Sequence, residues 1–190
     1  MVQEQELLRG ARSLEEAALG EVFDTYYPAL YRYIYYHIRH RETAEDLTAE
    51  VFTRMLEQLA EGCGPSQHLR AWLYRVAYNV VVDESRRQAY RDHDPLDDGA
   101  TSGDGNVERQ AEHSLLRDKA RVALGELTPD QRAVLILKYL EGYGNRDVAR
   151  MLGTTIGAVK ALQYRGLVAM RRRLRGGLDG DGNQGRECTA

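Results

Sequence analysis

Apolar residues recur through most of this 190-residue chain at intervals of three and four, which is the spacing of one face of an α-helix. The clearest stretch has its apolar positions at Leu69, Trp72, Leu73, Val76, Ala77 and Val80. No long stretch alternates apolar and polar residues as a half-buried strand does, and the chain holds only four prolines. The pattern therefore predicts an all-α fold.

Two helices are expected near the N-terminus. Ser13 and Glu16 have the spacing of a capping box, in which the serine oxygen accepts from a backbone N–H and the glutamate reaches back to the cap. This predicts a helix from there to about Tyr26. Pro28 suits the first turn of a second helix, where its missing N–H costs nothing, and that helix is expected to end near Arg39.

Two further helices are expected before residue 91. The first begins at Thr43 and ends at a break containing glycine and proline at 61–66. Its apolar face comprises Leu47, Val51, Phe52, Met55 and Leu59. The second begins at Leu69, and Trp72 on its apolar stripe is interpreted as a core residue. The opposite face carries Arg70, Tyr74, Arg75, Tyr78, Asn79, Arg86 and Arg87.

The composition changes sharply after residue 90. Residues 91–108 are acidic and rich in glycine, and they lack the apolar surface needed to order a segment, so they are expected to form a flexible linker. The linker separates two helical domains, expected at 1–90 and 109–175. Residues 176–190 hold five glycines and no apolar pattern, which predicts a disordered tail.

The second domain is expected to open with a helix at 110–126. Thr128, Pro129 and Gln131 then combine a cap, a proline at the first helical position and a glutamine three residues after the cap. This predicts another helix, closed by glycines at 142 and 144. Its expected buried stripe is Ala133, Val134, Leu137 and Leu140.

Residues 145–164 have the pattern of a helix-turn-helix. Ala149 supplies the small residue needed where two helices cross, Gly153 can adopt the positive φ of the tight turn, and Val159 packs the second helix onto the first. The remaining inward positions are expected to be Val148, Leu152, Ile156 and Leu162. The expected helix caps are Asn145, and Thr154 or Thr155.

The charge distribution supports a nucleic-acid role for this motif. The whole chain carries a formal charge of −3, yet residues 113–175 hold 13 basic and 5 acidic residues. The outward face of the second helix should present Thr155, Lys160, Ala161, Gln163, Tyr164 and Arg165, followed by Arg171, Arg172, Arg173 and Arg175. Lysine, arginine and glutamine read base edges, and clustered arginines suit phosphates. The alternative is a three-helix core whose basic face is only solvated.

Four segments resemble the extracytoplasmic-function sigma factors, small two-domain initiation factors of bacterial RNA polymerase in the sigma-70 family. Residues 43–56 resemble the segment AEDL-x-x-E-x-F of region 2, and 69–87 resemble its helix RAWLYRIARN-x-x-x-D-x-x-RR. Residues 127–137 resemble the LP-x-x-QR opening of region 4, and 157–165 resemble its recognition helix. The resemblance spans about residues 15–175.

The recognition helix departs from the family string G-T-V-(K/R)-S-R-x-x-R-A. The departures are Ala158, Ala161, Leu162 and Gly166. Two polar candidates for base contact are thereby lost. Base reading is expected to shift to Lys160, Gln163, Tyr164 and Arg165.

The resemblance implies a non-enzymatic, cytoplasmic bacterial protein that binds core RNA polymerase through its clamp and flap regions and recognises and melts promoter DNA. Region 2 would dock on the polymerase and read the minus-ten element. Because bases stack on aromatic rings and enzymes capture extruded bases in pockets, the break and the helix after it suit a melted strand. The residues expected near a captured base are Ser66, Gln67, His68 and Arg70. Those expected toward upstream duplex are Tyr78, Asn79, Arg86 and Arg87. The acidic contacts to the polymerase are expected at Glu45, Asp46 and Glu50.

Other classes of function remain open alternatives. One is a stand-alone helix-turn-helix regulator with an N-terminal sensing or dimerisation domain. Another is a small helical enzyme, but the acidic residues lack a nearby nucleophile or ligand set. His37 and His40 could share a metal, yet no third ligand is near, so a solvated helix end is the better interpretation. We therefore expect no cofactor, metal or membrane insertion. The resemblance to the family makes an anti-sigma protein plausible as a further partner.

Overall fold

The computed structural model describes residues 2–91, 119–120 and 122–176, and every element in these ranges is helical. The expected linker and tail, and most of the helix expected at 110–126, lie outside the described residues. The helices of the N-terminal half are α1 (Val2–Arg12), α2 (Glu16–Ile38), α3 (Arg41–Ala60) and α4 (Leu69–Arg91). Those of the C-terminal half are α6 (Pro129–Leu135), the π-helical turn η1 (Ile136–Leu140), α7 (Asn145–Met151) and α8 (Ile156–Gly176).

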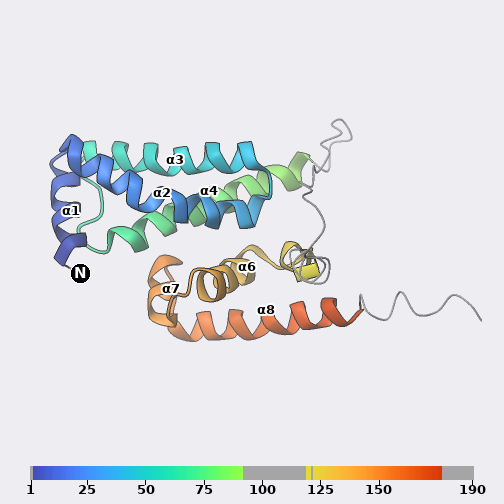
Figure 1. The fold of residues 1–190 in the computed structure, drawn as a ribbon. Coiled ribbons are helices and arrows are strands. Elements are labelled where there is room, and N and C mark those ends of the chain that lie inside the picture. The colour runs from blue at the N-terminus through green and yellow to red at the C-terminus, as the bar shows by residue number, and fades with distance from the viewer. Residues whose placement is uncertain (1, 92–118, 121, 177–190) are drawn as a thin grey trace, which may run out of the picture.

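The two halves form two packed layers. Helices α1 to α4 make one bundle, and α6, α7 and α8 form a second group that lies along one side of it (Figure 1). The halves touch through α7 against α4, and through α6 and η1 against α2. One cluster of buried side chains runs through both, from Leu30 and Tyr74 in the bundle to Leu137 and Val159 in the second group. The prediction of two helical domains is confirmed, and the domains pack together.

The prediction for the first two helices is wrong in its boundaries. A single helix, α2, runs through Pro28, and its N-cap is Glu15 without a side-chain cap bond. Proline inside a helix removes one backbone bond and crowds the preceding turn. Here Tyr26 and Leu30, on either side of Pro28, are both buried on the core face of the helix, and this tertiary packing outweighs the local cost.

Ser13 ends a helix instead of starting one. Its N–H bonds to the carbonyl of Arg9 in α1, and Leu14 then takes the left-handed conformation with φ of 56°. Sequence reasoning missed α1 itself. A signal was present, because Leu7, Leu8 and Ala11 have helical spacing and all three are buried.

Three single positions also differ from expectation. His37 is buried in the core at 5% exposure, not solvated at a helix end. Leu140 and Ile156 were expected to be buried and are exposed. Leu140 is the last residue of the turn η1, and Ile156 is the first residue of α8, so each lies where its helix leaves the core.

Candidate nucleic-acid interface

The C-terminal half forms the expected helix-turn-helix from α7 and α8. Ala149 and Val159 are buried where the helices cross, and Gly153 turns the chain with φ of 64°. The Thr155 hydroxyl accepts from the N–H of Ala158 at 3.1 Å, so Thr155 caps α8 as expected. The cap of α7 is Gly144, not Asn145, because the Asn145 side chain instead accepts from the Lys138 ammonium at 2.6 Å.

A second local prediction that the structure confirms is the start of α6. The Thr128 hydroxyl accepts from the N–H of Gln131 at 3.4 Å, and Pro129 is the first helical residue. This short helix supports the recognition helix, since α6 and α8 pack against each other.

The outward face of α8 presents most of the residues expected there. Lys160, Ala161 and Arg165 are exposed, and Tyr164 is 71% exposed, more than any other large hydrophobic residue that the structure describes. Thr155, Arg171, Arg172 and Arg173 are exposed as well. Gln163 differs, because its amide donates to the Tyr139 hydroxyl at 2.8 Å and is held against η1. The side chain of Arg175 lies outside the described residues.

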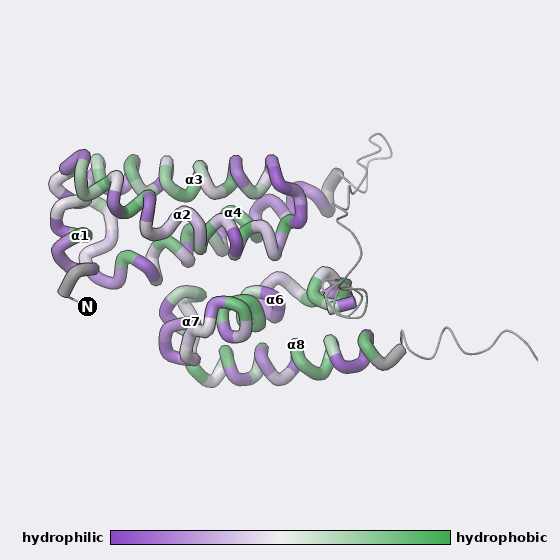
Figure 2. The backbone as a smooth tube through the Cα atoms, in the orientation of Figure 1, coloured by the Kyte–Doolittle hydropathy of each residue, from purple (hydrophilic) through white to green (hydrophobic). Residues whose placement is uncertain are grey.

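The same helix is not uniformly basic. Hydrophilic and hydrophobic residues alternate along α8 (Figure 2), and Leu167 and Val168 are exposed between the arginines. Arg173 is paired with Glu126 at 2.5 Å. Among the α8 side chains that the structure describes, the exposed positive charge other than that of Arg173 therefore lies at Lys160, Arg165 and the pair Arg171 and Arg172.

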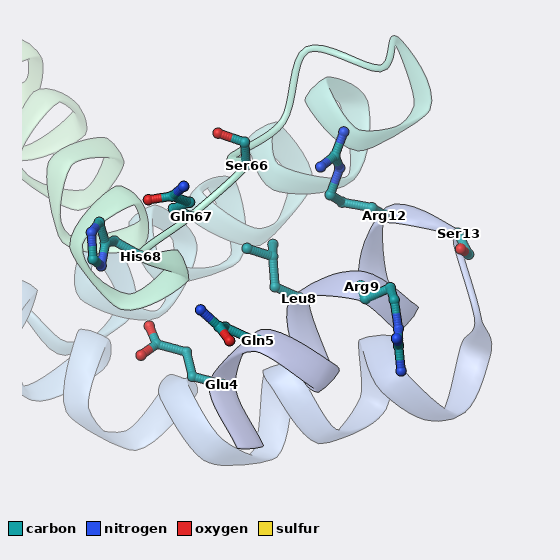
Figure 3. Close-up of a pocket in the computed structure, with 9 residues that line it drawn as sticks. All are labelled: Glu4, Gln5, Leu8, Arg9, Arg12, Ser13, Ser66, Gln67 and His68. Atoms are coloured by element: carbon teal, nitrogen blue, oxygen red, sulfur yellow. The ribbon is translucent and has the colours of Figure 1, made fainter. Parts of the chain in front are cut away.

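In the N-terminal half, the loop before α4 borders a cavity of about 600 Å³. Ser66, Gln67 and His68, all expected near a captured base, form one wall. Helix α1 forms the other, and Figure 3 shows Gln5 and Leu8 opposite Gln67. The residues of this second wall, which sequence reasoning missed, are Glu4, Gln5, Leu8, Arg9, Arg12 and Ser13.

The loop has an unusual backbone conformation at the residue just before α4. His68 adopts the left-handed region with φ of 56°, which is uncommon for a residue other than glycine. The Glu4 carboxylate of α1 accepts from the N–H of Arg70 at 3.1 Å and so caps α4 from outside the helix. The Arg70 guanidinium lies 5.9 Å from the centre of the Tyr26 ring, and Arg70 does not line the cavity.

On the outward face of α4, some side chains are exposed and others contact the rest of the chain. Asn79, Arg86 and Arg87 are exposed. The Tyr78 hydroxyl instead donates to the carboxylate of Asp130 in α6, and burial together with that bond raises the pKa of Tyr78 to about 12. Tyr74, which the pattern put on this face, is buried, and burial raises the pKa of its hydroxyl.

The three acidic residues expected to face the polymerase lie on the outer side of α3. Asp46 is exposed, Glu45 pairs with Arg41 at 3.0 Å, and Glu50 pairs with Arg54 at 2.6 Å. Beside them, α2 carries a ladder of aromatic rings at four-residue intervals. The centres of consecutive rings lie 4.9 to 6.3 Å apart, and the rings are those of Phe23, Tyr27, Tyr31 and Tyr35. We call this combined surface the acidic–aromatic face.

Among the described residues, no three His, Cys, Asp or Glu side chains are grouped so that they could hold a metal ion. His37 is separated from His40 by the helix end, since His40 instead accepts from the N–H of Thr43 as the cap of α3. Within the same residues, no helix combines the length and the apolar character needed to cross a membrane.

Comparisons with known proteins agree with the sequence motifs. The family model for Sigma-70 region 2 matches residues 22–91, and the model for Sigma-70, region 4 matches residues 117–170. The chain is 34% identical over 173 residues to the ECF RNA polymerase sigma factor BldN of Streptomyces coelicolor, covering 89% of this chain and 65% of BldN. It is 30% identical over 163 residues to SigX of Bacillus subtilis, covering 80% of this chain and 81% of SigX.

Two solved structures have a similar fold. CnrH, solved with the cytosolic domain of CnrY, matches with a TM-score of 0.64 and 24% identity, over 94% of this chain and 98% of CnrH. RpoE from Bartonella quintana, solved with the anti-sigma factor NepR, matches with a TM-score of 0.62 and 22% identity, over 82% of this chain and 96% of RpoE. With both sigma-70 regions present and SigX matched along most of its length, the chain belongs to the extracytoplasmic-function family of RNA polymerase sigma factors.

Proposed function

We propose that this chain binds core RNA polymerase, directs it to promoters and helps to open them. The observation that carries the proposal is that one chain holds an exposed basic helix-turn-helix in its region 4 and a cavity beside the expected base-capturing loop in its region 2. A duplex reader alone needs only the first feature. A factor that also opens DNA needs the second, because an extruded base must be held away from its partner strand.

Region 4 would read the upstream promoter element as duplex DNA. Lys160 and Arg165 are exposed on the first turns of α8, where a recognition helix meets base edges, and Arg171 and Arg172 lie further along for phosphates. Tyr164 offers an exposed ring for apolar contact with a thymine methyl group. Because Gln163 is bound to Tyr139, it would have to exchange that hydrogen bond for one to a base.

Region 2 would hold the melted strand. The cavity has polar groups on both walls, with the amides of Gln5 and Gln67 able both to donate to and to accept from a base edge. Arg9 and Arg12 add positive charge along the α1 wall, which suits the adjoining phosphates. Asn79, Arg86 and Arg87 would then follow the duplex upstream along α4.

The acidic–aromatic face would dock on the polymerase. Its carboxylates complement a basic partner, and its rings supply apolar area at low cost in side-chain entropy. Replacing Glu45, Asp46 and Glu50 together by their amides should weaken co-migration with core polymerase. A control with the same loss of charge, Glu6, Glu16 and Glu21 to glutamine on α1 and α2, should co-migrate like the parent.

The function can be tested with purified chain, core polymerase and labelled single strands. The complex should retain the non-template strand of a promoter's minus-ten region in preference to its template strand, and neither component should do so alone. A stand-alone regulator would instead bind duplex tightly without polymerase and show no preference between strands, and that result would replace the proposal.

We further propose that the chain performs no catalytic step of its own, acts in the bacterial cytoplasm where the polymerase is, and takes an anti-sigma protein as a partner. RpoE of Bartonella quintana was solved with such a partner, and membership of the same family supports the analogy. Capture of a co-expressed neighbouring gene product that blocks binding to core polymerase would test the last point.

A further inference from the structure

An acidic residue of α1 holds the start of α4. The first N–H groups of a helix have no carbonyl partner within that helix, and the N–H of Arg70 is one of these. The Glu4 carboxylate accepts from it at 3.1 Å, across 66 positions of sequence. A helix is usually capped by the residue just before it, which takes an extended conformation. Here that residue, His68, is left-handed with φ of 56°, and another helix supplies the acceptor.

Glu4 is presented from a firmly packed helix. Leu7 and Ala11 of α1 are buried, and α1 packs against α2. The two helices approach closely, because a Cβ built on Gly10 would lie 2.7 Å from the Cβ of Ala18. The position of α1 on the bundle is therefore well defined. The segment matched by the region 2 model begins at residue 22, so the contact to Arg70 is made from outside that segment.

The contact lies at the edge of the cavity described above. Glu4 lines this cavity opposite the loop residues 66–68, and Figure 3 shows its carboxylate extending from α1 toward the start of α4. A left-handed conformation is costly for a residue with a Cβ and persists only where the surroundings stabilise it. Arg70 is held twice, because its N–H bonds to Glu4 and its guanidinium lies 5.9 Å from the centre of the Tyr26 ring. These two contacts fix the end of the loop.

We propose that Glu4 is a positioning residue for base capture, which orders the loop 66–68 before a melted strand arrives. The proposal rests on the proposed function of region 2, and it adds a residue that acts through the loop. A site that is already ordered loses less conformational freedom on binding, so the same contacts give a higher affinity. The negative charge of Glu4 repels phosphates, so a loss of base-dependent binding on removing Glu4 would have to come through the loop.

Amide hydrogen exchange of the full chain, followed by NMR, tests the ordering itself. Glu4→Ala should speed exchange at the Arg70 N–H by about fivefold or more, as expected for the loss of a typical capping bond. Glu4→Gln removes the same charge but keeps a side-chain oxygen that can accept, so its exchange should stay close to that of the parent. Glu6→Ala, on an exposed position of the same helix, should leave exchange at Arg70 unchanged.

Unchanged exchange in Glu4→Ala, or equal acceleration in Glu4→Gln or Glu6→Ala, would overturn the ordering role. Glu4→Ser, whose hydroxyl is too short to reach Arg70, is the second variant if Glu4→Ala does not fold.

The consequence for DNA is measured by fluorescence anisotropy with core polymerase and labelled non-template strands. The strands span the minus-ten region of a promoter mapped by run-off transcription, and each is intact or abasic at one position. In the parent, loss of the captured base should weaken binding by about tenfold. In Glu4→Ala this factor should fall to about twofold, because fewer chains hold the loop ready. Glu4→Gln and Glu6→Ala should keep the parent's factor.

Equal factors in the parent and Glu4→Ala would overturn the positioning role, and so would equal losses in Glu4→Ala and Glu4→Gln. If the parent complex does not retain the strand at all, the proposed function fails. The exchange comparison alone then still decides whether Glu4 orders the loop.

Discussion

The buried His37 makes stability depend on pH in a way that can be calculated from its surroundings. Its ring lies in the core against Tyr33, with centres 4.7 Å apart, and neither ring nitrogen has a hydrogen-bond partner among the residues that the structure describes. Burial, and secondly the positive charge of Arg132, lower the pKa of His37 from 6.5 to about 3. The folded chain therefore holds a neutral imidazole where the unfolded chain would hold a charged one in mildly acidic solution.

The direction in which stability changes with pH follows from proton linkage. Between pH 6.5 and about 3, the unfolded state binds a proton at His37 that the folded state does not, so the free energy of unfolding falls as the pH falls. Each pH unit in this window costs about 1.4 kcal/mol, which gives about 2 kcal/mol at pH 5 and about 5 kcal/mol across the whole window. Above pH 6.5 the residue contributes no pH dependence.

This pH dependence of stability can be tested by urea unfolding at a series of pH values from about 7.5 to 4.5. His37→Phe keeps an aromatic ring beside Tyr33 and removes the titration. Below pH 6.5 its stability should therefore fall less steeply than that of the parent, by about 1.4 kcal/mol per pH unit. His68→Asn removes an exposed histidine and serves as the matched control for loss of a histidine. Equal slopes for the parent and His37→Phe would refute the reasoning.

Four further substitutions have definite expected outcomes. Gly20→Ala, in α2 with no heavy atom within 4 Å of a Cβ there, should raise the free energy of unfolding by about 0.5–1 kcal/mol in urea titration, and a lower midpoint would contradict this. Gly153→Ala should lower the melting temperature, at a cost of about 1 kcal/mol or more, because φ is 64° and the new Cβ would crowd Arg75. Lys160→Ala and Arg165→Ala should each weaken binding to the preferred upstream duplex by about 1–3 kcal/mol and affect unrelated duplexes less, measured by competition at one salt concentration. Equal loss on every sequence would identify them as phosphate contacts.

Some of this structure could be predicted because its causes are local. Thr128 and Thr155 cap their helices through backbone bonds within three residues, and Gly153 turns the chain through its own φ. Such features are determined by neighbours in the sequence. The apolar residues at 69, 73, 77 and 80 follow one helical stripe, and all four are buried.

The failures arise where distant residues decide the outcome. Ser13 and Glu16 have a capping spacing, but α1 reaches Ser13 first and ends there. Pro28 is tolerated inside α2 because residues on both sides of it pack into the core. His37 is buried because the other half of the chain covers it, with Arg132 bound to its carbonyl from 95 residues away.

In the candidate site too, one part could be predicted from the sequence and the other could not. The loop wall formed by Ser66, Gln67 and His68 followed from a break between two helical patterns. The opposite wall on α1 came from a helix that was not expected, and its apposition to the loop is a tertiary contact. An ion pair between Arg32 of α2 and Glu141, the residue after η1, likewise joins positions 109 apart, and no periodic pattern points to it.

Run-off transcription tests the central claim most directly. Purified core RNA polymerase would be supplied with a pooled promoter library, with and without this chain, and the starts would be mapped. The account predicts specific starts that require the chain, sharing one upstream and one minus-ten element. An absence of such starts, together with a failure of the chain to co-migrate with core polymerase, would contradict it.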